Sequence, residues 1–362
     1  MTRIRGEELV LRRRTWIGTA AGIVLLPTIG LFNSPGKYQE LYFEVPPVSC
    51  PKDVLLFSVV VTLLLALFIA GTLFSVARHA SVTFSPLVCG RKGFFPLTSI
   101  CLTALAVSWC FAWTRFPWFS PYQHHTFLLL WMSYIALGNT LLYELSGTAP
   151  ITRQPKQYLL SFPMSALCWW TFEYLNRFVH NWCYLGLEGF SAGEYLFLAS
   201  LSFSTVLPAI WVTRELLTSF FRFSANAPRE FFLISRWFAM ALFILTTLSL
   251  IFLPFTPDYL FPILWISPIT LALSIERLQG QEIVLTSAKI GGLISWAFAG
   301  LCCGFFWELW NFYSLNKWIY RIPFVGVAPV FEMPILGYAG YLPFGVLCGM
   351  ILVSYATPPR AQ

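Results

Sequence analysis

Two short runs of this sequence place a glutamate and an asparagine three residues apart within strongly apolar surroundings. The runs are FEYLN at residues 172–176 and WELWN at residues 307–311. Residues three apart share one face of a helix, so each run presents a carboxyl and an amide together. Two such carboxyls could divide acid and base chemistry, because burial keeps one protonated while a better solvated one stays ionised. Glu173, Asn176, Glu308 and Asn311 are therefore our candidate catalytic residues, with each asparagine orienting its carboxyl by hydrogen bonding.

Further polar and aromatic residues follow both runs in the same order. They are Trp182, Tyr184 and Glu194 after the first run, and Trp318, Tyr320 and Glu332 after the second. Four basic side chains lie among them: Arg177, His180, Lys317 and Arg321. We predict that these ten residues bind a substrate, the basic groups holding an anionic headgroup and the aromatic faces stabilising a developing cation.

A structural role competes with this functional hypothesis. Glutamate and asparagine near the end of a span can cap helices or pair with Arg177 and Arg321, and Trp and Tyr at that depth fit an ordinary interfacial belt. Duplicated carboxylates within apolar helices are costly, however, and are usually functional or tightly paired. The repetition of the whole set therefore favours a site.

Several kinds of chemistry lose support from the sequence. It has no HExxH, GxSxG, P-loop or GxGxxG motif in a suitable context, and its nine cysteines and four histidines form no cluster at metal-ligand spacing. Hydrolysis by a nucleophile triad, NTP-driven work and a zinc site are therefore disfavoured. We expect neither a metal nor a cofactor.

The composition is that of a polytopic membrane protein. Of 362 residues, 57% are hydrophobic and only 11% are charged, whereas soluble domains average about 25% charged, and the mean hydropathy is +0.69. Aromatic residues make up 18% of the chain, more than an interfacial belt needs. Many of them should line helix contacts or an interior cavity.

We predict an all-α transmembrane bundle, because a span needs about 20 mainly apolar residues. Cutting the chain at charges, Pro and Gly gives about ten spans: residues 15–33, 54–77, 95–113, 126–146, 158–178, 193–213, 237–256, 259–275, 290–312 and 331–355. The spans at 237–256 and 259–275 are the least certain in this count, because only a short polar stretch separates them.

The orientation follows from Lys and Arg, which concentrate in cytoplasmic loops. An alternating path places 17 of the 23 Lys and Arg residues on one side, which puts both termini in the cytoplasm and the two Glu–Asn pairs near the outer leaflet. The net charge of +7 is then explained by the Lys and Arg residues of the cytoplasmic loops, and a nucleic-acid role is disfavoured.

Spans 3–6 also resemble spans 7–10, with equivalent residues 134 to 138 positions apart. LWMSYIAL at residues 130–137 matches LWISPITL at residues 264–271. Units of four spans enter the membrane from the same side, so these would be parallel repeats. The expected organisation is an N-terminal pair of spans (1–94), a first repeat (95–213), a cytoplasmic amphipathic connector (214–236) and a second repeat with the C-terminal tail (237–362).

The second run belongs to a longer pattern, WExWN, KWxYxxP and FEMPxLGYxGxLPFG, over residues 307–345. This pattern resembles a signature of bacterial polytopic inner-membrane proteins whose function is not established. More remotely, duplicated spans with intramembrane Glu beside Trp are similar to membrane-embedded terpene cyclases and lycopene cyclase domains. That resemblance implies an acid role for Glu173 and Glu308, although the proline-flanked paired glutamates of lycopene cyclase domains are missing here.

Three functions remain open at this point. The chain could bind or modify a lipid or isoprenoid near the outer leaflet, it could be a proton- or ion-coupled transporter or lipid flippase, or it could be a non-enzymatic membrane scaffold. All three imply membrane lipids as partners and a bacterial inner membrane as the location. The substrate and the oligomeric state are not indicated by the sequence.

Overall fold

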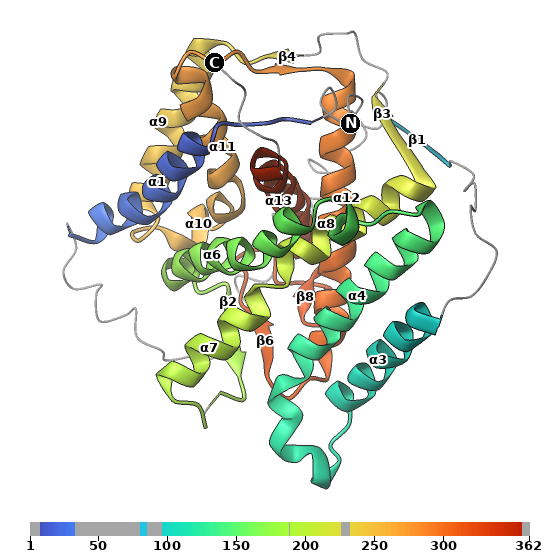
Figure 1. The fold of residues 1–362 in the computed structure, drawn as a ribbon. Coiled ribbons are helices and arrows are strands. Elements are labelled where there is room, and N and C mark those ends of the chain that lie inside the picture. The colour runs from blue at the N-terminus through green and yellow to red at the C-terminus, as the bar shows by residue number, and fades with distance from the viewer. Residues whose placement is uncertain (1–7, 33–79, 85–95, 188, 226–231, 357–362) are drawn as a thin grey trace.

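The computed structural model describes residues 8–32, 80–84, 96–187, 189–225 and 232–356 (Figure 1). The predicted span at residues 54–77 lies outside these ranges, as does most of the expected N-terminal domain. The other nine predicted spans each overlap helix, although the last, at residues 331–355, begins in a turn and the strand at Met333–Pro334. The described chain is mostly helical, which confirms the predicted fold class at that level.

The helices differ in length and in the way they are broken. The α-helices are α1 (Arg13–Phe32), α3 (Pro96–Trp113), α4 (Thr126–Ser146), α5 (Pro150–Arg153), α6 (Pro155–Val179), α7 (Ala192–Phe203), α8 (Val206–Phe220), α9 (Arg236–Phe252), α10 (Pro257–Leu260), α11 (Ile263–Leu278), α12 (Ser287–Phe312) and α13 (Tyr341–Ala356), and the 3₁₀ helices are η3 (Pro117–His125) and η4 (Ile335–Gly340).

Six helical segments of the described chain are long and apolar enough to cross a membrane. They are Arg13–Leu31, Pro96–Trp113, Pro117–Ser146, Ala192–Phe220, Ala288–Phe312 and Ile335–Ala356. The apolar helix α9 is shorter, at 17 residues. Their number and composition make the chain an integral membrane protein.

Within the described ranges, four small antiparallel sheets of two strands each connect the helices, and the sequence did not predict them. The pairs are β1 (Ala80–Phe84) with β3 (Phe221–Ala225), β2 (Trp182–Leu185) with β6 (Lys317–Tyr320), β4 (Phe232–Leu233) with β5 (Val284–Leu285), and β7 (Pro329–Val330) with β8 (Met333–Pro334). In the second sheet Trp182 lies opposite Tyr320 and Tyr184 opposite Trp318.

The helices pack around α12 and α13 (Figure 1). Helices α1, α9 and α11 contact one another on one side of α13, and the pair α3 and α4 lies on the other side. Helices α12 and α13 approach closely because glycines face each other: a Cβ added to Gly300 would lie 2.6 Å from Gly345 Cα. Small residues at such crossings let helix backbones touch, as is common in membranes.

The predicted sixth span and connector differ from the structure in detail. The helix expected at residues 193–213 is interrupted after Phe203, and it resumes as α8, which continues to Phe220. Of the expected connector at 214–236, residues 214–220 therefore belong to α8 and residues 221–225 form β3. Ser204 and Thr205 turn their hydroxyls onto the carbonyls of Leu201 and Ser202 at the interruption.

Candidate functional site

The site is built where α6 and α12 end and their chains turn into β2 and β6. Helix α6 ends at Val179, and His180 follows in the left-handed conformation, with φ of 50°. Its backbone N–H donates to Asn176 O at 2.7 Å. This C-cap closes the helix, so that the chain can leave it directly as the strand β2.

Asn176 and Asn311 fasten these strands to their helices. Asn176 Nδ2 donates to Trp182 O at 2.8 Å, and its Oδ1 accepts from Trp182 N at 3.3 Å. Asn311 makes the same two contacts with Trp318, at 2.7 and 2.8 Å. The predicted role of the two amides is therefore corrected: they bind the strand backbone and position the neighbouring tryptophans.

Glu173 is a buried carboxyl that receives three aromatic donors. Its Oε1 accepts from Trp169 Nε1 at 2.9 Å, from Trp182 Nε1 at 3.1 Å and from Tyr184 OH at 2.6 Å. Only 8% of its surface is exposed. Indole N–H groups are donors only, so this carboxyl fixes the orientation of three rings at once.

Glu308 plays a similar part from α12 and is fully buried, with 0% exposed. Its Oε1 accepts from Tyr320 OH at 2.7 Å and from Tyr341 OH at 2.6 Å. The Tyr320 hydroxyl in turn accepts from Trp318 Nε1 at 2.7 Å. In the described part of the chain, Glu308 Oε2 is buried without a hydrogen-bond partner.

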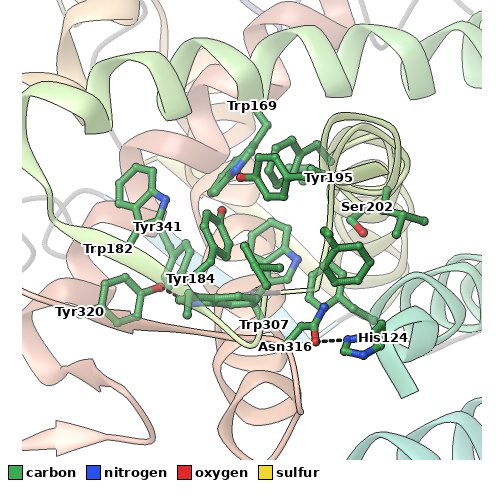
Figure 2. Close-up of a pocket in the computed structure, with 18 of the residues that line it drawn as sticks. His124, Trp169, Trp182, Tyr184, Tyr195, Ser202, Trp307, Asn316, Tyr320 and Tyr341 are labelled. Carbon is green, nitrogen blue, oxygen red and sulfur yellow. Dashed lines mark hydrogen bonds between the residues drawn. The ribbon is translucent and has the colours of Figure 1, made fainter. Parts of the chain in front are cut away.

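The rings that these carboxyls hold line a partly open cavity of about 140 Å³ (Figure 2). We call it the aromatic cavity. It is lined by His124, Phe127, Trp169, Trp182, Tyr184, Leu187, Phe190, Tyr195, Leu198, Ala199, Ser202, Phe203, Val206, Trp265, Trp307, Asn316, Trp318, Tyr320 and Tyr341. A water molecule needs roughly 10–15 Å³ of such space, so the cavity has room for a much larger group.

The two carboxyls lie one layer behind this lining. Neither Glu173 nor Glu308 is among the described lining residues, yet each accepts hydrogen bonds from side chains that are. The polar ends of these rings are thereby occupied, and the cavity is left with mostly ring carbon. Burial raises the pKa of the Tyr184 phenol, and that of Tyr320, well above the ordinary value, so both phenols keep the proton that they donate.

Few polar groups reach the cavity itself. His124 Nδ1 lies 2.5 Å from Asn316 Oδ1, and both residues line one side of the cavity (Figure 2). The remaining oxygens on described lining side chains belong to Ser202 and to the tyrosines, including Tyr195. None of the described lining residues is a lysine, an arginine, an aspartate or a glutamate.

The other predicted binding residues lie outside the cavity. Glu194 caps α7, where its Oε2 accepts from Ser191 N at 2.9 Å and from Ser191 Oγ at 2.7 Å. Glu332 forms an ion pair with Lys317 at 2.5 Å. The side chains of Arg177, His180 and Arg321 are exposed. Of the predicted site residues, the structure therefore brings together Glu173, Glu308 and the paired Trp and Tyr residues, while Glu194, Glu332 and the basic groups do not line the cavity.

The sequence also missed some important lining residues. Trp169 lies one helical turn before Glu173, a spacing that could have identified it. Trp265 lies in the LWISPITL segment, and Trp307 and Tyr341 lie in the pattern at residues 307–345. No spacing rule connects Tyr341 with Glu308, because they lie on different helices and meet only through the α12–α13 packing.

No group of three or more His, Cys, Asp or Glu side chains that could hold a metal occurs among the residues that the structure describes. Comparison with protein-family models, with curated proteins and with solved structures gave no match. The resemblance of residues 307–345 to a bacterial membrane-protein signature therefore stays a prediction, and the function has to be inferred from the site.

Proposed function

We propose that this integral membrane protein binds and modifies a lipid or isoprenoid in the aromatic cavity, near the outer leaflet of a bacterial inner membrane. The observation that carries the proposal is a cavity lined by aromatic rings and backed by two buried carboxyls from distant parts of the chain. Ligand sites are typically concave and mostly apolar, with a few placed polar groups. Carboxyls within apolar spans usually mark function.

In this proposal, two phenol hydroxyls transfer protons between Glu308 and the ligand. Tyr320 and Tyr341 both line the cavity and both donate to Glu308. A carboxyl behind a phenol can exchange a proton with a bound ligand through the hydroxyl group without touching it. Glu308 is the proton reservoir in this scheme, because its Oε2 is buried without a partner among the described residues.

The duplication and the orientation belong to the same proposal. The β2–β6 register pairs Trp182 with Tyr320 and Tyr184 with Trp318, which is the reciprocal pattern that two equivalent copies make about a two-fold axis. The matching bonds of Asn176 and Asn311 support the same equivalence. Two four-span repeats, within a bundle of ten spans, account for these pairings.

Ion pairs support the placement of both termini in the cytoplasm. Arg12 binds Glu276 at 3.0 Å, and Arg214 binds Glu8 at 2.7 Å. Leu11 N also donates to Ser354 Oγ, near the end of α13, at 2.9 Å. The first described residues and the end of the last helix thus lie together, among residues that the charge bias assigns to the inner side.

The test is to identify lipids that co-purify with the protein. We expect mass spectrometry of gently solubilised protein to find one enriched lipid class that is lost in Trp307→Ala. Trp237→Ala is the matched control, because that ring is 86% exposed on α9. Lipids of a deletion strain should accumulate the substrate of the reaction, and complementation with Glu308→Gln should leave it accumulated. The same lipids in both purified proteins, together with an unchanged deletion lipidome, would contradict the proposal.

Proton-coupled transport or lipid flipping is the second candidate. Glu308 Oε2, which has no hydrogen-bond partner among the described residues, favours it because intramembrane carboxyls also serve as proton relays. Reconstitution decides between the two. Movement of labelled lipid driven by a pH gradient, lost in Glu308→Gln, supports transport. Turnover of lipid without a gradient supports the enzyme.

A further inference from the structure

The described lining of the aromatic cavity carries no charged side chain, and two carboxyls accept hydrogen bonds from its rings. Two carboxyls lie one side chain away from it, and the described lining contains no lysine or arginine. Lys317 lies outside the lining and forms an ion pair with Glu332. A cation bound inside the cavity would meet no basic side chain in the described lining and would lie one side chain from both carboxyls.

The lining also determines which kind of cation fits. Trp169, Trp182 and Tyr184 give their donors to Glu173, and Tyr320 and Tyr341 give theirs to Glu308. A ring that donates a hydrogen bond through its N–H or O–H becomes richer in electrons. Aromatic faces attract cations, Trp most strongly, and quaternary ammonium groups are their typical ligands in proteins.

A primary ammonium is a poorer ligand for this cavity. It carries three N–H donors, and each would need an acceptor, while the carboxyl oxygens lie behind the rings, Asn316 Oδ1 already contacts His124, and Ser202 and the tyrosines offer only neutral hydroxyl oxygens. A trimethylammonium group has no N–H, so it leaves no donor unsatisfied on burial. Its methyl groups also match an apolar lining.

We propose that the aromatic cavity binds a quaternary ammonium group, as in a choline-type lipid headgroup. The inference rests on the proposed function, because it names the substrate class of the same site. The phenols of Tyr320 and Tyr341 then contact the headgroup region, and the acyl chains extend from the open side of the cavity into the bilayer.

The first experiment measures binding by calorimetry in a maltoside detergent. The probes are dihexanoyl phosphatidylcholine, its neutral isostere in which carbon replaces the choline nitrogen, and dihexanoyl phosphatidylethanolamine. We expect the choline lipid to bind about 10-fold more tightly than either of the others. Glycerophosphocholine, which lacks the chains, tests whether the ligand is a lipid or a free compound.

The second experiment changes charge and ring separately. Glu173→Gln should reduce the preference for choline over the isostere by about 10-fold, while affinity for the isostere stays constant. That constant affinity is an internal control for folding. Trp307→Leu should weaken choline binding, Trp307→Phe should restore part of it, and Trp237→Leu on the exposed face of α9 should have no effect.

Each outcome has a defined meaning. Equal binding of the choline lipid and its isostere overturns the inference but leaves lipid binding intact. If glycerophosphocholine binds as tightly as the lipid, the cavity recognises a quaternary ammonium group, but its ligand is a free compound and not a lipid. No binding of any of the three lipids, or of farnesyl phosphate as an isoprenoid probe, contradicts the proposed function as well.

Discussion

Glu308 depends on two phenols, and one of them comes from a different helix. Tyr341 OH donates to Glu308 Oε1 in a buried contact. Tyr341→Phe removes this donor without changing the shape of the ring, so that, of the donors in the described part of the chain, the carboxyl keeps only the Tyr320 hydroxyl. Leaving a buried polar group short of a partner costs about 1–3 kcal/mol. We expect a lower thermal midpoint in detergent together with weaker ligand binding.

Tyr338→Phe is the matched control for that change. Tyr338 also lies near the start of α13, but its hydroxyl donates to Val330 O in an exposed contact of 3.1 Å. Water can replace that bond, so the midpoint should move little. Equal shifts of the thermal midpoint in the two variants would show that the Tyr341–Glu308 hydrogen bond contributes no more to stability than the exposed one.

At this scale the sequence predicted which residues are special better than it predicted what they touch. Helical spacing placed Glu173 and Asn176 on one face, and both are buried at the site. The periodicity of a helix does not say whether a carboxyl or a ring lies nearer to a cavity. Here most of the rings that bond to the carboxyls come from strands or from another helix, only Trp169 among the described donors shares a helix with its carboxyl, and the rings cover the carboxyls.

Among the elements, the α12–α13 crossing decides the position of Tyr341. A Cβ on Gly304 would overlap the Tyr341 ring. Gly304→Ala must therefore push the ring and its hydroxyl away from Glu308. Overpacking of this kind costs about 1–3 kcal/mol, and we expect a lower thermal midpoint and a loss of ligand affinity like that of Tyr341→Phe.

Gly193 provides the comparison for the glycine change. It lies in the first turn of α7, and a Cβ there would meet nothing within 4 Å. Gly193→Ala should be neutral or stabilise the helix by up to about 1 kcal/mol. If Gly304→Ala behaves like Gly193→Ala, close packing does not control the site.

The helices were predictable as elements because long apolar runs are a strong local signal, and nine of the predicted segments overlap helix. The strands β2 and β6 were not, since each has four residues and its pairing partner lies more than 130 residues away. The predicted Trp and Tyr pairs do belong to these strands. Their register depends on the tertiary packing of α6 and α12, which no local pattern encodes.

At the scale of the whole molecule, the first described residues pack against three helices at the end away from the cavity. Glu8 accepts from Arg214 Nη2 at 2.7 Å and from Trp296 Nε1 at 3.1 Å, and Leu9 and Leu11 are buried beside it. This segment therefore ties together α8, α12 and, through Ser354, α13.

Glu8→Gln tests that tie. Removing one charge of a buried pair costs about 3 kcal/mol, so the variant should unfold at a lower temperature and expose its N-terminal segment to protease. Arg153→Gln is the control, because 31% of the Arg153 side chain is exposed in its pair with Glu215 and exposed pairs contribute about 1 kcal/mol or less. Protease resistance equal to that of the unchanged protein would contradict the prediction.

The proposed placement of the cavity at the outer leaflet can be measured in intact cells. Gln281 lies shortly after Glu276, whose ion-pair partner Arg12 is one of the cations assigned to the cytoplasm. Leu315 lies between α12 and β6, beside the cavity. Both positions are exposed. In a background without reactive native cysteines, Leu315→Cys should react with a membrane-impermeant maleimide from outside, and Gln281→Cys should react only after lysis. Reversed labelling would place the aromatic cavity at the cytoplasmic leaflet, so that any lipid it binds would be drawn from the inner face of the membrane.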